Sequence, residues 1–199
     1  MDILTKLAIP AIVLLAVTSL SLLISRDWRW SILALGAQYA GVFVLIGLSW
    51  SIEMSVTKIV AGWMSGAVLG IAMQIAPESW QEAEKSSPSS VLFRLFTAAL
   101  AGTAIFTLAP LMAKWLPGIQ RPQAYGGLIL ICMGLLHLGL TAQPLRVMLD
   151  LLTILAGIDI FYATIESSTL VAGMLAAVDL ALSLAGAYLI INPGIEEAE

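Results

Sequence analysis

The stretch LLTILAGIDIFYAT, residues 151–164, holds one carboxylate, that of Asp159, inside an otherwise apolar run. The stretch VAGMLAAVDLALSLAGAYLI, residues 171–190, holds another, that of Asp179. Apolar runs of about 20 residues cross the hydrocarbon core of a bilayer as helices. Since a charged side chain at that depth costs roughly 2.5–3.5 kcal/mol on insertion scales, we expect both acids to face protein and to have a function.

The remainder of the chain has the same apolar character. Of its 199 residues, 60% are hydrophobic and 11% are charged, and the mean hydropathy is +0.98. Apolar runs of bilayer length recur along the chain, whereas a transmembrane β-barrel would show alternating segments of about 10 residues. The sequence therefore predicts an all-α, polytopic membrane protein with about seven transmembrane helices.

The expected spans divide the chain into units. By approximate residue number, the spans are 3–25, 31–48, 52–76, 91–111, 123–140, 145–164 and 168–191. The expected organisation is an N-terminal three-helix unit at 1–76, a polar loop at 77–90, a fourth helix with its connection at 91–122, a second three-helix unit at 123–192 and an acidic tail at 193–199.

The basic residues predict the orientation of these spans. With seven spans, one side carries the C-terminal tail and five basic residues, while the other carries Lys6, Lys114 and Arg121. Loops rich in Lys and Arg stay in the cytoplasm, so we expect a cytoplasmic C-terminus and an N-terminus outside. The expected location is a prokaryotic cytoplasmic membrane.

Several common chemistries have no counterpart in the sequence. Cys132 is the only cysteine and His137 the only histidine, which leaves no multi-cysteine or Cys/His metal site. Neither a glycine-rich phosphate loop nor a nucleophile with a suitably spaced base is present. The net charge of −4 and the scattered basic residues argue against nucleic acid as a partner. We therefore expect no catalytic residue, metal, cofactor or soluble substrate in this chain.

The last third of the chain carries short motifs in a characteristic order. They are GLIL at residues 127–130, LGLT at 138–141, a basic residue at Arg146, GIDI at 157–160 and AAVD at 176–179. In this order they resemble subunit K (chain 4L) of complex I, a small three-helix membrane subunit, over about residues 124–191. The C subunit of Mrp-type cation antiporters and the E subunit of hydrogenase-4-type complexes are similar.

The resemblance implies that the last three spans form a subunit-K-like three-helix unit. In that family, two intramembrane glutamates on adjacent helices link a quinone-side proton path to antiporter-like subunits. Carried over by position, Asp159 and Asp179 would be the corresponding proton-relay residues. They are one methylene shorter than glutamate and only twenty residues apart. At least one carboxylate is therefore expected off the midplane of the membrane, towards the outer face.

Two further residues are candidates for a proton relay. Lys58 lies about seven residues into its span and could pair with Glu53 or alternate between acidic partners; a lysine that snorkels to the interface is the alternative. His137 could pass protons between its helix end and Asp150, although an ordinary interfacial histidine is the favoured interpretation. Asp150 follows Arg146 by four residues, which predicts a surface ion pair.

Small residues indicate how the helices pack. Gly62, Gly66 and Gly70 are spaced by four, which lets a neighbouring helix approach closely, unless they are the incidental glycines common in membrane helices. The segment GAQ at 36–38 also lies at the same offset from Lys58 as GID at 157–159 from Asp179. This echo fits either a duplicated three-helix unit or a coincidence among alanine- and glycine-rich helices.

These observations lead to three functional hypotheses. The favoured one is a membrane subunit of a complex I-like, membrane hydrogenase-like or Mrp-like assembly, which supplies acids to a proton or cation path. Its partners would be antiporter-like or redox subunits and lipid, and it would not be an enzyme alone. The second is a structural or assembly subunit in which Asp159 and Asp179 hold helices together. The third is a stand-alone transporter of a small solute, for which the duplicated unit would be the sign.

Overall fold

The computed structural model describes residues 2–25, 27–77, 88–116 and 118–192, and these residues form seven helices. The helices are α1 (Asp2–Ile24), α2 (Trp28–Ile46), α3 (Ile52–Ile75), α5 (Pro88–Trp115), α6 (Arg121–Leu138), α7 (Pro144–Ile165) and α8 (Thr169–Ile191). Each coincides with an expected span to within a few residues. Most of the predicted polar loop (78–87) and the predicted acidic tail (193–199) lie outside the described residues.

Six helices in the described ranges are long and apolar enough to cross a membrane: α1, α2, α3, α5, α7 and α8. They indicate a multi-pass membrane protein. The remaining helix, α6, has 18 residues and begins with Arg121, Pro122 and Gln123, so its apolar run is shorter than a typical span. The predicted all-helical fold is thus confirmed for these residues, whereas a membrane crossing by α6 stays a prediction.

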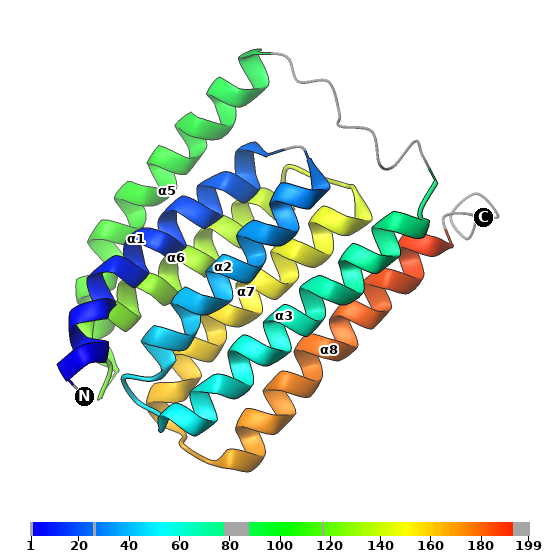
Figure 1. The fold of residues 1–199 in the computed structure, drawn as a ribbon. Coiled ribbons are helices and arrows are strands. Elements are labelled where there is room, and N and C mark those ends of the chain that lie inside the picture. The colour runs from blue at the N-terminus through cyan, green and yellow to red at the C-terminus, as the bar shows by residue number, and fades with distance from the viewer. Residues whose placement is uncertain (1, 26, 78–87, 117, 193–199) are drawn as a thin grey trace.

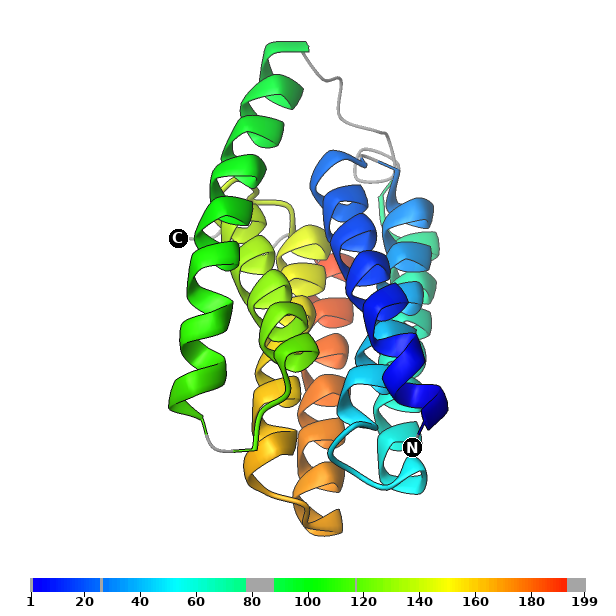
Figure 2. The same cartoon turned by 90° about the vertical axis from the view of Figure 1, so that its left-hand side faces the viewer.

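Successive helices run in alternating directions. We call the upper end of the bundle the one that holds the α1–α2 and α6–α7 turns, and the lower end the one that holds the N-terminus and the α2–α3 and α7–α8 turns (Figures 1 and 2). Accordingly, α1, α3, α6 and α8 run upwards, while α2, α5 and α7 run downwards. The start of α1 and the end of α8 therefore lie at opposite ends of the bundle.

Two three-helix halves face each other helix by helix. α1 packs against α6, α2 against α7 and α3 against α8, while α2 and α7 are the helices that contact both other members of their own half. Because the paired helices run in the same direction, the two halves are parallel. α5 lies outside this arrangement, along α6 (Figure 2). The halves cover the ranges predicted for the two three-helix units, whose independence as domains stays a prediction.

Hydrogen bonds join the two halves at the lower end. Trp50, in the turn between α2 and α3, donates from its indole Nε1 to the backbone oxygen of Glu166 at 2.8 Å. Gln123, in the first turn of α6, donates to the backbone oxygen of Leu45 at 3.0 Å and to the hydroxyl of Ser49 at 2.7 Å. The carbonyl of Leu45 belongs to the last turn of α2, where a backbone oxygen needs such a partner.

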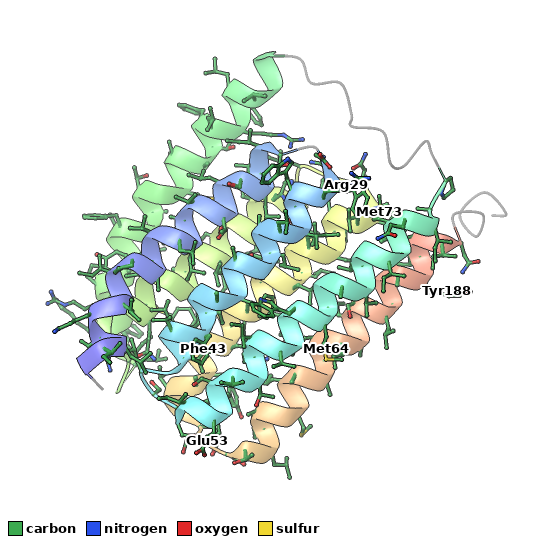
Figure 3. All side chains as sticks on the ribbon, viewed as in Figure 1. Arg29, Phe43, Glu53, Met64, Met73 and Tyr188 are labelled. Carbon is green, nitrogen blue, oxygen red and sulfur yellow. The ribbon has the colours of Figure 1, made fainter. Side chains whose placement is uncertain are left out.

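The bundle is apolar on the outside and contains polar groups inside. Phe106 and Leu184 on the outer surface are 73% and 60% exposed, whereas Lys58 is completely buried. Charged side chains such as Arg29 and Glu53 lie at opposite ends of the bundle (Figure 3). This distribution is expected for a protein whose sides contact lipid and whose ends contact water.

The glycine ladder of α3 faces α2. A Cβ atom at Gly62 would overlap the ring of Tyr39, and Cβ atoms at Gly66 and Gly70 would lie 3.6 and 3.4 Å from Ile32. The close approach that the glycines predicted therefore takes place between neighbouring helices of one half. It also sets the position of Tyr39, because the ring occupies the space that a side chain at residue 62 would need.

Candidate functional site

The two acids that the sequence singled out meet at one lysine. The Nζ atom of Lys58 on α3 lies 2.5 Å from Oδ2 of Asp159 on α7 and 3.0 Å from Oδ2 of Asp179 on α8. All three side chains are 0% exposed. We call these three residues the central cluster. It lies between the two halves, since the lysine comes from one half and both acids come from the other.

The two carboxylates of the central cluster have different surroundings. The hydroxyl of Tyr39 donates to Oδ1 of Asp179 at 3.3 Å, and the hydroxyl of Ser65 donates to the backbone oxygen of the same residue at 3.2 Å. Among the described residues, Oδ1 of Asp159 is buried without a hydrogen-bond partner. The ion pair with Lys58 is thus the contact that compensates the charge of Asp159.

The charges of the central cluster do not balance. One ammonium group faces two carboxylates, so the cluster carries one excess negative charge when all three groups are ionised. Glu53, the other expected partner of Lys58, is exposed at the start of α3. Because a buried net charge is costly, the uptake of one proton or one small cation would stabilise the cluster. The arrangement is therefore suited to binding and releasing a single positive charge.

The central cluster occupies the lower half of the bundle. Lys58 is six residues from the start of α3 and Asp159 six from the end of α7, so both Cα atoms lie roughly 9 Å from the lower end at about 1.5 Å of rise per residue. Asp179 is ten residues into α8, or about 15 Å from that end. The short separation in the sequence thus keeps both acids in the lower half of the bundle, and Asp159 lies nearer the lower end than Asp179.

A second set of polar contacts extends upwards from the central cluster. The side-chain amide of Gln38 donates to the hydroxyl of Ser19 at 3.3 Å and accepts from the hydroxyl of Thr153 at 3.2 Å. Gln38 and Thr153 are 0% and 2% exposed. Gln38 adjoins Tyr39 on α2, and Thr153 is six residues above Asp159 on α7. These contacts therefore continue the buried polar region towards the upper end.

A third polar contact lies near the upper end. Nδ1 of His137 is 2.6 Å from Oδ1 of Asp150, and both side chains are buried. Nε2 of His137 and Oδ2 of Asp150 have no hydrogen-bond partner among the described residues. Two cations, Arg146 on α7 and Arg94 on α5, act electrostatically on Asp150. We call His137 and Asp150 the upper pair.

The upper pair differs from the sequence-based expectation. A surface ion pair of Arg146 with Asp150 was expected, but these two residues are only 5% and 1% exposed; His137 is 3% exposed, and its place at the membrane interface stays a prediction. The physical reason is the close approach of α6 and α7. A Cβ atom at Gly134 would lie 2.6 Å from the side chain of Ile154 and 3.2 Å from the backbone oxygen of Asp150. The glycine thus lets α7 cover the end of α6.

Four residues of the site were not predicted: Ser19, Tyr39, Ser65 and Thr153. Hydroxyl side chains in helices often bond to their own backbone, as Thr153 also does with Leu149 at 2.8 Å, so residue type alone says little about them. A spacing would have been more informative. Thr153 follows Asp150 by three residues, which places both on one face of α7. Polar residues at that interval in an apolar helix indicate the face turned away from lipid.

Other kinds of site receive no support in the described ranges. Nowhere in them do three His, Cys, Asp or Glu side chains gather as a metal site would require. No family model, no curated protein and no solved structure matches the chain. The resemblance to subunit K therefore stays a prediction, which depends on the motifs in the last third of the sequence.

Proposed function

We propose that this chain is a membrane subunit of an ion-translocating assembly and that the central cluster is part of its proton or cation path. The observation that carries the proposal is the buried contact of one lysine with two carboxylates between the two halves. Ionisable groups within a membrane are costly, and they typically mark ion pathways and proton relays. Lys58, Asp159 and Asp179 are the residues to which we assign this role.

The expected chemistry follows from the charge balance of the central cluster. When one carboxylate takes up a proton, it becomes neutral and Lys58 stays paired with the other. Release of that proton restores the excess negative charge. The proton is best placed on Asp159, because the charged form of Asp179 keeps a second donor in Tyr39.

The driving reaction belongs to other subunits in this proposal. The motifs between residues 127 and 179 that resemble subunit K support redox or antiporter-like partners. Any redox cofactor would lie in those partners, and this chain would contribute a segment of the path. The His137–Asp150 pair is a candidate for a second segment.

Asp179→Asn tests the proposal. The substitution removes one charge at nearly constant size, and it leaves Lys58 paired with Asp159. We expect native gels to show an intact assembly, and vesicles that contain it to have lost ion translocation. Thr107→Val, at an exposed threonine on α5, is the control and should retain both properties. Full translocation by the Asp179→Asn assembly would overturn the proposal.

The same experiment distinguishes the proposed ion path from the hypothesis of a structural subunit. If the ion pairs only hold the helices together, Asp179→Asn should lose the assembly on native gels and reduce translocation in proportion. Retained assembly with lost translocation is the result that separates a path from a packing contact.

A stand-alone solute transporter is the second candidate, and the parallel pairing of the two halves favours it. Transporters built from parallel repeats bind their substrates between the repeats, near the middle of the membrane. In this chain the central cluster lies between the two halves. Lys58 and Asp179 would be equivalent positions of a duplicated unit, and they contact each other. Solute transport by vesicles that contain only this chain would support the second candidate.

A further inference from the structure

We propose that the upper pair, His137 and Asp150, is the group through which the central cluster exchanges protons with the upper side of the membrane. This inference rests on the proposed proton path and adds its connection to one side. Its basis is the placement of buried polar side chains, which succeed one another along α7 from the upper end to the central cluster.

Three residues mark this line on α7. Asp150 lies about 9 Å below the upper end, Thr153 about 4.5 Å further down and Asp159 about 9 Å beyond that. Beside the last interval, the side chain of Gln38 accepts from Thr153, and its neighbour in the sequence, Tyr39, donates to Asp179. Buried polar groups thus recur at intervals that one or two hydrogen-bonded waters can span.

His137 is suited to be the first group of the line. It lies in the last turn of α6, close to the upper end, and its Nδ1 contacts Asp150. Its Nε2 has no partner among the described residues, which leaves this atom to accept a proton. Imidazole takes up and releases protons near neutral pH more readily than other side chains do.

The proton transfer can be written atom by atom. Neutral His137, with its proton on Nδ1, accepts a second proton at Nε2 and becomes an imidazolium. The Nδ1 proton then moves to Oδ1 of Asp150, which leaves a neutral imidazole protonated at Nε2 and a neutral carboxylic acid. Asp150 passes its proton through water and the hydroxyl of Thr153, which accepts one proton as it gives up its own. The proton that Thr153 gives up moves through one or two further hydrogen-bonded waters to a carboxylate of the central cluster.

The charged groups that face the upper pair support this assignment. Arg146 and Arg94 act on Asp150, and both guanidinium groups keep their charge at all physiological pH values. His137 and Asp150 are therefore the groups at this place that can take up and pass on a proton. The two arginines also provide countercharges for Asp150 once its proton has left.

One test uses the fact that His137 is the only histidine of the chain. With isotope-labelled histidine, NMR of the purified full chain reports on the upper pair alone. We expect the His137 signal to respond to pH, and the response to differ in Asp159→Asn, because this substitution removes one of the two carboxyl groups that can hold the proton in the central cluster. Thr107→Val should cause no shift. A signal that does not respond to pH, or an identical response in Asp159→Asn, would overturn the inference.

A second test measures translocation by the full assembly. His137→Gln keeps a hydrogen-bonding group next to Asp150 but cannot carry a proton, so we expect translocation to fall by about 100-fold or more with the assembly intact. Normal translocation by His137→Gln, together with its loss in Asp179→Asn, would refute the role of the upper pair and leave the proposed function standing. Normal translocation in both variants would refute both. If His137→Gln did not assemble, the NMR response of the native histidine would still decide.

Discussion

Lys58 is the residue on which the electrostatics of the interior depend. Its side chain is completely buried, and its ammonium group contacts the carboxylates of Asp159 and Asp179. Removing one partner from a buried ion pair is more damaging than removing both, because the remaining charge stays buried without compensation. This asymmetry gives a test of the ion pairs that can be carried out on the purified chain, without other subunits.

We expect Lys58→Met to lower the free energy of unfolding in detergent by about 3–5 kcal/mol, because two buried carboxylates would then face each other without a cation. Lys58→Met combined with Asp159→Asn should recover part of that loss, since only the charge of Asp179 remains and Tyr39 still donates to it. Denaturant titration of the purified variants would measure the difference. Wild-type stability of Lys58→Met would contradict the ion-pair geometry.

The Tyr39 hydroxyl offers a smaller perturbation of the same cluster. Tyr39→Phe removes the donor to Oδ1 of Asp179 and leaves the ring in place. Hydrogen bonds to charged groups contribute about 1.5–3 kcal/mol, so we expect a loss of stability in that range. In the Asp179→Asn background the same substitution should cost less, and a double-mutant cycle would show whether the two effects are coupled.

At the residue scale, the sequence predicted the charged members of the site but not their contacts. Charges in apolar runs are conspicuous, so Asp159, Asp179 and Lys58 could be selected without a structure. Their meeting depends on how α3 and α7 each pack against α8, which is a property of helices distant in sequence. No local pattern around Lys58 encodes that choice of partners.

At the scale of single helices, glycines decide which surfaces touch. Gly62 accommodates the ring of Tyr39, whereas a Cβ atom at Gly102 on α5 would meet nothing within 4 Å. The two positions form a natural pair of variants, because the same substitution has a steric cost at one and none at the other.

We expect Gly62→Ala to destabilise the protein by about 1–3 kcal/mol through overpacking and to displace Tyr39 from Asp179. Gly102→Ala should be neutral or stabilise the helix by up to about 1 kcal/mol, because alanine has the higher helix propensity. Thermal unfolding in detergent would compare the two. Equal effects at both positions would contradict the packing of α3 against α2.

The helices themselves were predictable because each coincides with an apolar run, which has bilayer length in all of them except α6. The helix α6 is shifted relative to its expected span. It begins at Arg121, two residues before that span, and ends at Leu138, two residues before the end of the span. Gln123 is polar because it bonds to the end of α2, a contact that cannot be inferred from its neighbours in the sequence. The burial of the upper pair escaped prediction for a similar reason, since it requires the close approach of α7 at Gly134.

At the scale of the whole molecule, the pairing of the halves places the central cluster between two parallel three-helix units. Only a weak indication of two three-helix units is present in the sequence. Gln38 precedes Lys58 by the same number of residues as Asp159 precedes Asp179. α1 pairs with α6, α2 with α7 and α3 with α8, while an origin of the two halves by duplication stays a prediction.

The alternating helices also predict the topology of the chain in the membrane. If α6 crosses together with the six apolar helices, the two termini lie on opposite sides of the membrane. The distribution of basic residues predicts that the C-terminal side is the cytoplasm. Reporter fusions that are active on only one side of the membrane would test this at each terminus. Termini on the same side would contradict a crossing by α6.

The account as a whole depends on protons entering and leaving the central cluster. Infrared difference spectra of the purified chain, recorded between acidic and alkaline pH, detect the stretching band of buried protonated carboxyl groups. We predict that this band appears on acidification, shrinks in Asp159→Asn and in Asp179→Asn, and is unchanged in Glu53→Gln, at the exposed start of α3. A spectrum that is the same with and without the two aspartates would contradict the central claim.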